Sequence, residues 1–288
     1  MFVKMTKIKL DNISYVYGAG TPYEVLALDN VDLEIEKGSV TGIIGHTGSG
    51  KSTLMQLLNG LERPTSGKIY LDGVNIWEEP KKIVQIRFRV GLVMQYPEYQ
   101  LFEETVAKDI AYGPSNMGLD KKEIDRRVIN AADIVGLSEE LLQKSPFDLS
   151  GGEKRRAAIA GVMAMTPEVL VLDEPAAGLD PIGRATIFSA ISKYREETGA
   201  TIIIVSHSME DMARICDNIV VMAGGKVIMS GKTHDVFSRA DILVENGLDI
   251  PEISKLMLKL RNEGIVIDDI PYTVEDALKI IKKEKTYE

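Results

Sequence analysis

The residues best suited to chemistry lie in one glycine-rich stretch, Gly45-His-Thr-Gly-Ser-Gly-Lys-Ser-Thr53. It fits the pattern G-x-x-x-x-G-K-[ST], in which the glycines let the backbone wrap phosphate oxygens and the following helix offers them unpaired N–H groups. Lys51 can reach the β- and γ-phosphates of a nucleotide, and the Ser52 hydroxyl can ligate Mg²⁺. The predicted phosphate-binding residues are Gly45, His46, Thr47, Gly48, Ser49, Gly50, Lys51, Ser52 and Thr53.

The segments on either side of this loop supply the context that the pattern needs. Ser39–Gly45 is predicted to be a short buried strand, and Ser52–Asn59 is predicted to be a helix that ends at Gly60. A glycine-rich turn that merely resembles the motif is the alternative. The order of strand, loop and helix argues against that alternative.

Two carboxylates follow an apolar strand further along the chain, in Val169-Leu-Val-Leu-Asp173-Glu174-Pro175. An acid at the end of a buried strand, downstream of a phosphate loop, is the usual second half of a magnesium–nucleotide site. Asp173 is therefore predicted at the metal, and Glu174 is predicted to polarise an attacking water. An ordinary turn at the end of the strand is the alternative.

Two polar side chains also follow predicted strands. Val90–Gln95 ends in an amide just before Tyr96-Pro97 breaks the strand, so Gln95 is either a ligand sensor or a simple cap. His207 follows the buried strand Thr201–Val205. Since open α/β sheets bind ligands at the carboxyl ends of their strands, a γ-phosphate contact is predicted for His207, with a structural histidine as the alternative.

Two weaker signals add to the predicted site. Leu149-Ser-Gly-Gly-Glu153 opens a predicted helix, so Ser150, Gly151 and Gly152 could present bare N–H groups to a second phosphate, although Ser-Gly-Gly is also a common turn. Tyr17 lies before the phosphate loop and could stack on a purine ring. A half-exposed strand tyrosine is an equally good interpretation of this residue.

The pattern of apolar residues predicts the architecture around these groups. Alternating residues in 7–17 and 31–35 predict an antiparallel β region, and residues 98–165 read as a helical insertion between strands. Within this insertion, helices are predicted over Glu103–Tyr112, Asp120–Val135 and Glu153–Met165. From 233 to 288 the chain is mostly helical and carries no chemical motif. The fold class predicted is α/β, a P-loop NTPase sheet with an antiparallel β subdomain, a helical insertion and a small C-terminal helical accessory domain. The expected division is 1–232 for the nucleotide-binding domain and 233–288 for an accessory domain that contacts partners.

Composition narrows the classes of partner. Lys and Arg number 34 against 43 Asp and Glu, a net charge of −9, which argues against nucleic acid and against a polybasic membrane anchor. No apolar run reaches the ~18 residues of a spanning helix, and no signal peptide is expected. The single cysteine, Cys216, is expected to be a reduced core thiol, and three histidines without a Cys/His cluster give no case for zinc.

The order of these motifs resembles that of the ABC ATPases over about residues 6–232. The segments that carry the resemblance are Gly45–Thr53, Gln95, Leu149–Glu153, Leu170–Pro175, Gly178-Leu-Asp180 and His207. The Ser-Gly-Gly-Glu signature between the two phosphate-site motifs sets that family apart from other P-loop proteins. Glu153-Lys154 replaces a Gln followed by Gln or Arg in many members, which is within the variation of the family.

The resemblance implies ATP and Mg²⁺ as ligands and a head-to-tail dimer of ATP-binding subunits. Each ATP would lie between the phosphate loop of one subunit and the signature of the other. Residue by residue, the resemblance places Tyr17 at the adenine-stacking position, Glu174 at the catalytic glutamate, Asp180 at the dimer-contact loop and His207 at the switch histidine. Gln95 falls at the glutamine of the Q-loop, and the expected metal set is Ser52, Gln95 and Asp173.

A narrower resemblance is to the ATP-binding subunits of energy-coupling factor importers, the second of the two paired types. It is carried by Thr21-Pro-Tyr-Glu-Val-Leu-Ala-Leu28 and Gln95-Tyr-Pro-Glu-Tyr-Gln-Leu-Phe-Glu-Glu-Thr105. It implies uptake of vitamins or other micronutrients, and a peripheral position on the cytoplasmic face of the cell membrane. A membrane coupling subunit and a substrate-binding membrane subunit are the implied partners.

The segment after Gln95 is the predicted contact with the membrane partner. Apolar Tyr99, Leu101 and Phe102 are mixed with acidic Glu98, Glu103 and Glu104, a composition that suits a helix with apolar and basic side chains. An ordinary surface loop is the alternative. For the whole protein, the alternative is a soluble ABC ATPase that acts as an ATP-driven clamp or regulator without transport.

Overall fold

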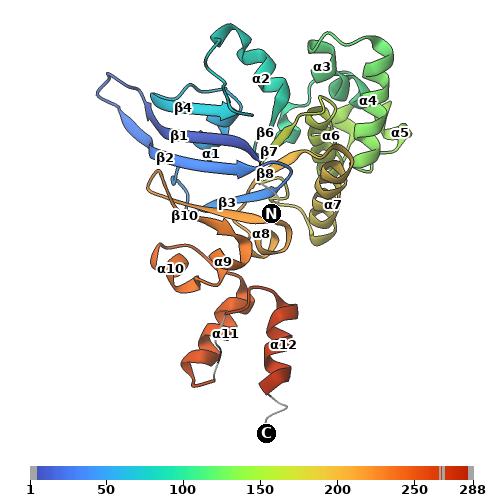
Figure 1. The fold of residues 1–288 in the computed structure, drawn as a ribbon. Helices are drawn as coiled ribbons and strands as arrows, with labels where there is room; N and C mark the ends of the chain where they lie inside the picture. The colour runs from blue at the N-terminus through green and yellow to red at the C-terminus, as the bar shows by residue number, and fades with distance from the viewer. Residues whose placement is uncertain (1–4, 266, 268–269, 285–288) are drawn as a thin grey trace.

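Two sheets form the centre of the molecule in a computed structural model that describes residues 5–265, 267 and 270–284 (Figure 1). The larger sheet has six strands in the order β10-β9-β3-β8-β7-β6, and β9, β3, β8, β7 and β6 run parallel. Its strands are β3 (Val40–Gly45), β6 (Val90–Val93), β7 (Val169–Asp173), β8 (Thr201–Val205), β9 (Asn218–Ala223) and β10 (Lys226–Lys232).

The smaller sheet is antiparallel and has the order β2-β1-β4-β5. Its strands are β1 (Thr6–Tyr17), β2 (Val25–Glu36), β4 (Ser66–Leu71) and β5 (Val74–Asn75). The antiparallel β region predicted from alternation is thus confirmed, and β2 begins earlier than expected because Val25–Leu28 pair with the end of β1.

The parallel strands are apolar on both faces, which explains their continuous apolar runs. Alternate residues of β7 and β8 enter two different apolar clusters: Val171 and Ile203 face the smaller sheet and helix α1 (Lys51–Leu58), whereas Leu172 and Ile204 face the helices on the other side. Those helices include α6 (Gly151–Met163), α7 (Pro181–Thr198) and α8 (Met209–Ile215). The P-loop NTPase type of sheet and the buried state of Cys216 are therefore confirmed.

The helical insertion between β6 and β7 is present, with boundaries that differ from those predicted. It contains α3 (Val106–Asn116), α4 (Lys121–Ile134) and the short α5 (Glu139–Leu142), which was not predicted, before α6. The predicted start of α3 at Glu103 was too early, because the Thr105 hydroxyl accepts a hydrogen bond from the N–H of Lys108 and caps the helix there. Between β5 and β6 lies α2 (Ile83–Arg89).

The C-terminal segment is helical, as predicted, and lies beyond β10 at the bottom of Figure 1. It comprises α9 (Thr233–Phe237), α10 (Ala240–Glu245), α11 (Glu252–Asn262) and α12 (Val274–Glu284). Its buried side chains, such as Phe237 and Met257, continue the apolar cluster of α8 and β9. None of the helices in the described ranges is long and apolar enough to cross a membrane.

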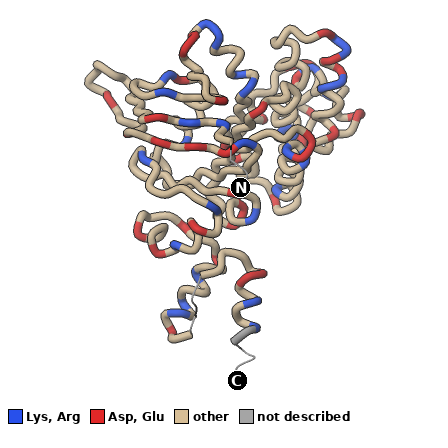
Figure 2. The backbone as a smooth tube through the Cα atoms, in the orientation of Figure 1, with Lys and Arg blue, Asp and Glu red and all other residues tan. Residues whose placement is uncertain are grey.

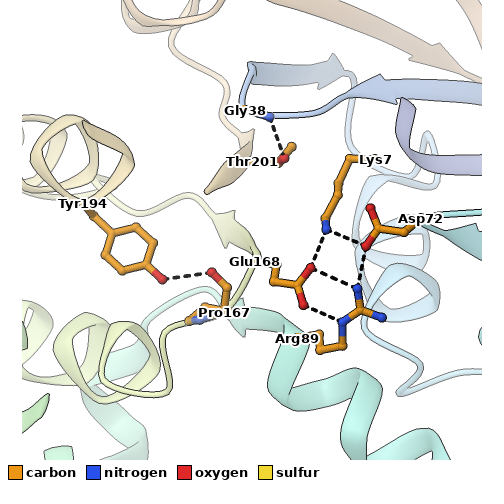
Figure 3. A network of polar contacts seen from close by, with 8 residues as sticks. All are labelled: Lys7, Gly38, Asp72, Arg89, Pro167, Glu168, Tyr194 and Thr201. Atoms are coloured by element: carbon orange, nitrogen blue, oxygen red, sulfur yellow. Dashed lines mark hydrogen bonds and ion pairs between the residues drawn. The ribbon is translucent and has the colours of Figure 1, made fainter. Parts of the chain in front are cut away.

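Charges of both signs are interspersed along the chain (Figure 2), and one group of them joins the two sheets. Lys7 of β1, only 3% exposed, donates to Asp72 at 2.7 Å and to Glu168 at 2.5 Å. Arg89, at the end of α2, binds the same two carboxylates at 2.5 and 2.6 Å (Figure 3). Because Glu168 immediately precedes β7, this cluster lies at the amino ends of the parallel strands.

The charge cluster leads to a prediction about stability. Hydrogen bonds from Arg89, together with Lys7, hold the pKa of Glu168 at about 2, against the effect of burial. A carboxyl whose pKa is lowered on folding contributes stability above its unfolded pKa and loses it as pH falls to the folded value. Since the Glu168 side chain is 44% exposed, we expect Glu168→Gln to reduce the free energy of unfolding at pH 7 by only about 1–2 kcal/mol.

Urea denaturation at a series of pH values measures this effect. The difference between parent and Glu168→Gln should narrow as pH falls from about 4.5 towards about 2. A difference that stays constant over this range would show that the carboxylate charge is not what stabilises the junction. Glu196→Gln, a change of the same kind outside the cluster, serves as the control.

Candidate functional site

The phosphate loop leaves the carboxyl end of β3 under tight steric constraint. A Cβ atom on Gly45 would lie 2.4 Å from the carbonyl oxygen of Met222 and 2.5 Å from Ser49 Oγ, so only glycine fits. Gly50 has φ of +101°, a value that favours glycine. The loop is also braced from β9–β10, because the N–H of Gly225 donates to the carbonyl of Ser49 at 3.2 Å.

Lys51 is the first residue of α1 and is 7% exposed. Its Nζ donates to the carbonyl oxygens of Gly45 at 2.7 Å and His46 at 2.9 Å. Burial lowers the pKa of Lys51, whereas Glu174 and Asp173 oppose that change. The ammonium group is therefore held in the curve of the loop, where phosphate oxygens of a nucleotide would approach the backbone N–H groups.

The two predicted carboxylates lie at the carboxyl end of β7. Burial, and next the nearby Glu174 carboxylate, raise the pKa of Asp173 to about 6, while Lys51 and His207 act in the opposite direction. Two carboxylates in a partly buried place repel each other, so a cation bound there would be favoured. The repulsion between the two carboxylates is therefore consistent with a site for a divalent metal ion.

Glu174 has a constrained backbone and a nearly free carboxylate oxygen. Its φ is +48°, and its N–H donates to the carbonyl of Val205 in the neighbouring strand at 2.9 Å. Oε2 accepts a hydrogen bond from Ser206 at 3.3 Å. Oε1 is buried and has no hydrogen-bond partner among the described residues, and His207 Nε2 lies 3.7 Å from it. A buried acceptor without a donor is costly, so Oε1 is suited to a water or another bound group.

Most of the predicted residues meet in one cavity of about 470 Å³. From the phosphate loop and the strand ends, the cavity is lined by Tyr17, Thr47, Gly48, Gly50, Lys51, Ser52, Thr53, Gln95, Asp173, Glu174 and His207. Gly45, His46 and Ser49 belong to the same loop but do not line the cavity. Their contacts support the loop instead, as in the hydrogen bond of His46 Nδ1 with the carbonyl of Thr47.

Tyr17 is 39% exposed at the edge of this cavity. Its hydroxyl shares a hydrogen bond of 3.1 Å with Thr53 of α1, and its ring meets Tyr15 edge to face with centroids 4.8 Å apart. Val25, Leu26 and Ala27 line the cavity beside it. No motif placed these three residues at the cavity. In the sequence they are an apolar run after Tyr23-Glu24, within the Thr21–Leu28 segment that carries the narrower resemblance.

Ser150, Gly151 and Gly152 lie elsewhere on the described surface and do not line this cavity. Ser150 caps α6: its side chain accepts from the N–H of Glu153, and Glu153 in turn accepts from the N–H of Ser150 at 2.8 Å. Apart from its chain neighbours and the nearby backbone of α6, no described atom comes within 4 Å of the place where a Cβ of Gly151 would be. The start of α6 is thus capped and open, and it lies apart from this cavity.

The expectation that Glu98 is an acidic surface group for a partner was wrong. Glu98 binds Arg155 of α6 through both carboxylate oxygens, at 2.5 and 2.9 Å. Arg155 is only 3% exposed and needs a counter-charge, so the charge of Glu98 is used inside the protein. Glu104 binds Lys108, one turn further on, in an exposed pair of the kind that is weak.

The position of Lys51 in this cavity leads to a prediction about nucleotide binding. Lys51→Ala should weaken binding of ATP by about one to two orders of magnitude, because a charge-assisted contact contributes roughly 1.5–3 kcal/mol. Isothermal titration calorimetry measures the affinity, and the exposed Lys121→Ala serves as a control. Equal affinities for Lys51→Ala and its parent would rule out the phosphate contact.

Comparison with known proteins places the chain in a family. Residues 28–177 match the family model described as ABC transporter. An energy-coupling factor transporter ATP-binding protein, EcfA2, of Clostridium acetobutylicum is 54% identical over 275 residues, covering 95% of this chain and 96% of that protein. The protein of the same name from Clostridium perfringens is 52% identical over 271 residues, covering 94% and 95%.

Two solved structures agree with this match. cbiO1 from Clostridium perfringens, described as part of the ABC transporter complex cbiONQ, has a TM-score of 0.75 and 40% identity, covering 88% of this chain and 99% of that chain. The ATP-binding cassette MJ0796, a dimer bound to ADP and phosphate, has a TM-score of 0.70 and 29% identity, covering 78% and 98%. The chain therefore belongs to the ABC transporter family, as an ATPase of the energy-coupling factor type.

Proposed function

We propose that this ATPase powers uptake of vitamins or other micronutrients from the cytoplasmic face of the cell membrane. In this proposal it pairs head to tail with a second ATP-binding subunit, and the pair binds a membrane coupling subunit that carries a substrate-binding membrane subunit. The observation that supports it most is one cavity that unites Lys51, Asp173, Glu174 and His207 while leaving Ser150–Gly152 outside. The names of the relatives support the transport role.

Hydrolysis is assigned to the groups at the carboxyl edge of the sheet. Lys51 and the loop N–H groups would hold the β- and γ-phosphates and stabilise their negative charge. Glu174 would orient and polarise the attacking water through Oε1, the oxygen without a hydrogen-bond partner among the described residues. His207, 3.7 Å from that oxygen, would orient the water and contact the γ-phosphate.

The same edge fits Mg²⁺. The Ser52 hydroxyl, the Gln95 amide and the Asp173 carboxylate are oxygen donors of the kind that Mg²⁺ prefers, and all three residues line the cavity. A bound Mg²⁺ would neutralise phosphate charge during transfer. The raised pKa of Asp173 supports this assignment, since a cation there would favour the ionised carboxylate.

The open helix start at Ser150 supports assembly in trans. The first-turn N–H groups of Gly151 and Gly152 suit a phosphate, but the segment does not line the cavity of its own subunit. A second subunit turned head to tail would supply the nucleotide, with Asp180 in the contact loop. The dimeric structure of MJ0796 with ADP and phosphate is consistent with this arrangement for a related cassette.

The contact with the membrane partner is assigned to the Tyr99–Thr105 segment. Tyr99 is 85% exposed and Phe102 is 58% exposed, and the ring of Phe102 packs edge to face on Tyr112 with centroids 5.0 Å apart. Glu103 and Glu104 supply acidic groups beside these rings. A helix with apolar and basic side chains would complement this surface. We assign 233–288 to an accessory domain that contacts partners.

Loss of the catalytic carboxylate should separate binding from turnover. Glu174→Gln keeps the shape of the side chain but removes its charge and basicity, so ATP should still bind while hydrolysis nearly stops, by about 10² to 10⁴-fold. Calorimetry and phosphate release measure the two quantities. In the assembled pair of ATP-binding subunits, both catalytic glutamates should be replaced, since a competent second site could hide the loss. Parent-like turnover would reject Glu174 as the base.

The docking surface gives the test of the transport role. The parent should co-purify with membrane proteins from detergent-solubilised membranes, whereas Glu103→Lys with Glu104→Lys should lose them because the charge is reversed. ATP affinity of the free chain should stay the same, since neither residue lines the cavity. Glu98 is left unchanged because of its bond to Arg155.

Glu139→Lys with Glu140→Lys on α5 makes the same change of charge away from this surface and should retain the membrane proteins. If the parent recovers no membrane protein, the transport role fails and the soluble clamp or regulator is favoured. If the parent recovers them and the Glu103/Glu104 variant does too, the coupling surface lies elsewhere.

A further inference from the structure

Arg155 is a buried cation whose contacts reach two other segments of the chain. It lies in the second turn of α6 and is 3% exposed. Its Nε and Nη2 bind the two carboxylate oxygens of Glu98 at 2.9 and 2.5 Å, and its Nη1 donates to the carbonyl oxygen of Ala177. The guanidinium carbon also lies 5.7 Å from the centroid of the Tyr96 ring. Every nitrogen of the guanidinium group is thus engaged.

These contacts join the segments that the site analysis links to the nucleotide. Tyr96 and Glu98 follow Gln95 directly. Ala177 closes the turn after Glu174, since its own N–H donates to the carbonyl of Glu174 at 3.1 Å. Helix α6 begins at the Ser150 cap. One side chain therefore connects the end of β6, the end of β7 and the start of α6.

The form of this contact favours fixing geometry over adding stability. A buried ion pair gains little net free energy, because removing both charges from water offsets most of their attraction. A bidentate contact between a planar guanidinium and a carboxylate does define distance and orientation. Burial raises the pKa of Glu98, but the bonds from Arg155 more than compensate, so the pKa is lowered and the pair remains charged.

The backbone next to this pair is also constrained. Tyr96 has φ of +54°, a left-handed conformation that is unfavourable for a residue other than glycine. Its ring rests on Arg155, and the short 3₁₀ helix Pro97–Gln100 follows at once. The exposed Tyr99 belongs to that helix, so its position depends on the geometry set by Arg155 and Glu98.

We propose that Arg155 is a positioning residue that makes the Gln95–Gln100 segment, the Glu174–Ala177 turn and α6 move as one unit. A displacement at the nucleotide is then passed to the surface around Tyr99, instead of being absorbed by an independent loop. The inference rests on the proposed function for the meaning of that surface. The transmission itself can be measured on the purified chain alone.

A fluorescent reporter at Tyr99 tests the proposal. Tyr99→Cys is labelled with an environment-sensitive thiol reagent, while Cys216 stays unlabelled because it is buried and burial raises the pKa of its thiol. The probe ligand is a non-hydrolysable ATP analogue with Mg²⁺, and calorimetry gives its affinity for each variant. In the parent, binding of the analogue should change the fluorescence of the label.

Two variants weaken the link in different ways. Arg155→Lys keeps the charge but cannot reach Glu98 and Ala177 together, and Glu98→Gln keeps the shape and removes the counter-charge. Each should reduce the fluorescence response at saturating ligand by about fivefold or more, whereas affinity for the analogue changes by less than about threefold. If Arg155→Lys does not fold, as judged by circular dichroism, Glu98→Gln carries the test.

Arg127→Lys is the matched control. Arg127 also binds a carboxylate, that of Glu123 at 2.7 Å, and a carbonyl oxygen, that of Met165 at 3.0 Å. These contacts involve neither the Gln95–Gln100 segment, nor the Glu174–Ala177 turn, nor the start of α6. It should lower thermal stability as much as Arg155→Lys does and leave the response intact. A full response in both Arg155→Lys and Glu98→Gln would overturn the proposal, as would a parent label that does not respond to bound ligand. Failure of the analogue to bind the parent would instead reject the nucleotide site itself.

Discussion

The site depends on one constraint, the parallel hydrogen bonding of β3 to β8 and of β8 to β7. Ile43 pairs with Val205, and Asp173 pairs with the same residue from the other side. Three strands that are far apart in the sequence therefore end at one edge, where a loop, a carboxylate turn and a histidine follow them. No single segment of the chain could bring these groups together, because they follow three strands that are distant in the sequence.

Burial then gives the edge its electrostatic character. It lowers the pKa of Lys51 and raises that of Asp173, so burial disfavours both charges. The two groups support each other, while Glu174 supports the charge of Lys51 and opposes that of Asp173. A nucleotide brings negative charge to the lysine, and a divalent cation brings positive charge to the carboxylates. The protein thus has matched but incompletely compensated charges, which a metal–nucleotide pair would complete.

The features predicted best from the sequence are those that depend on neighbouring residues in the chain. The apolar runs of the parallel strands and the fixed spacing from Gly45 to Ser52 locate the sheet and the loop, because both depend on neighbouring residues. Sequence-based prediction failed for features that depend on contacts with residues elsewhere in the chain. Glu98 looked like a surface acid because nothing near it in the sequence reveals Arg155. Val25–Ala27 enter the cavity only through the pairing of β2 with β1, and the start of α3 depends on the Thr105 cap. The roles of the individual site residues remain predictions.

The contact between Gly225 and Ser49 has a consequence for binding. The turn between β9 and β10 holds the phosphate loop from behind, and Asp29 of β2 holds that turn through the carbonyl of Gly225 at 2.9 Å. The conformational entropy of the loop is therefore lost during folding of the sheets and not when ligand arrives. A nucleotide meets a loop that is already ordered, so its affinity is linked to the integrity of a hairpin that it does not touch.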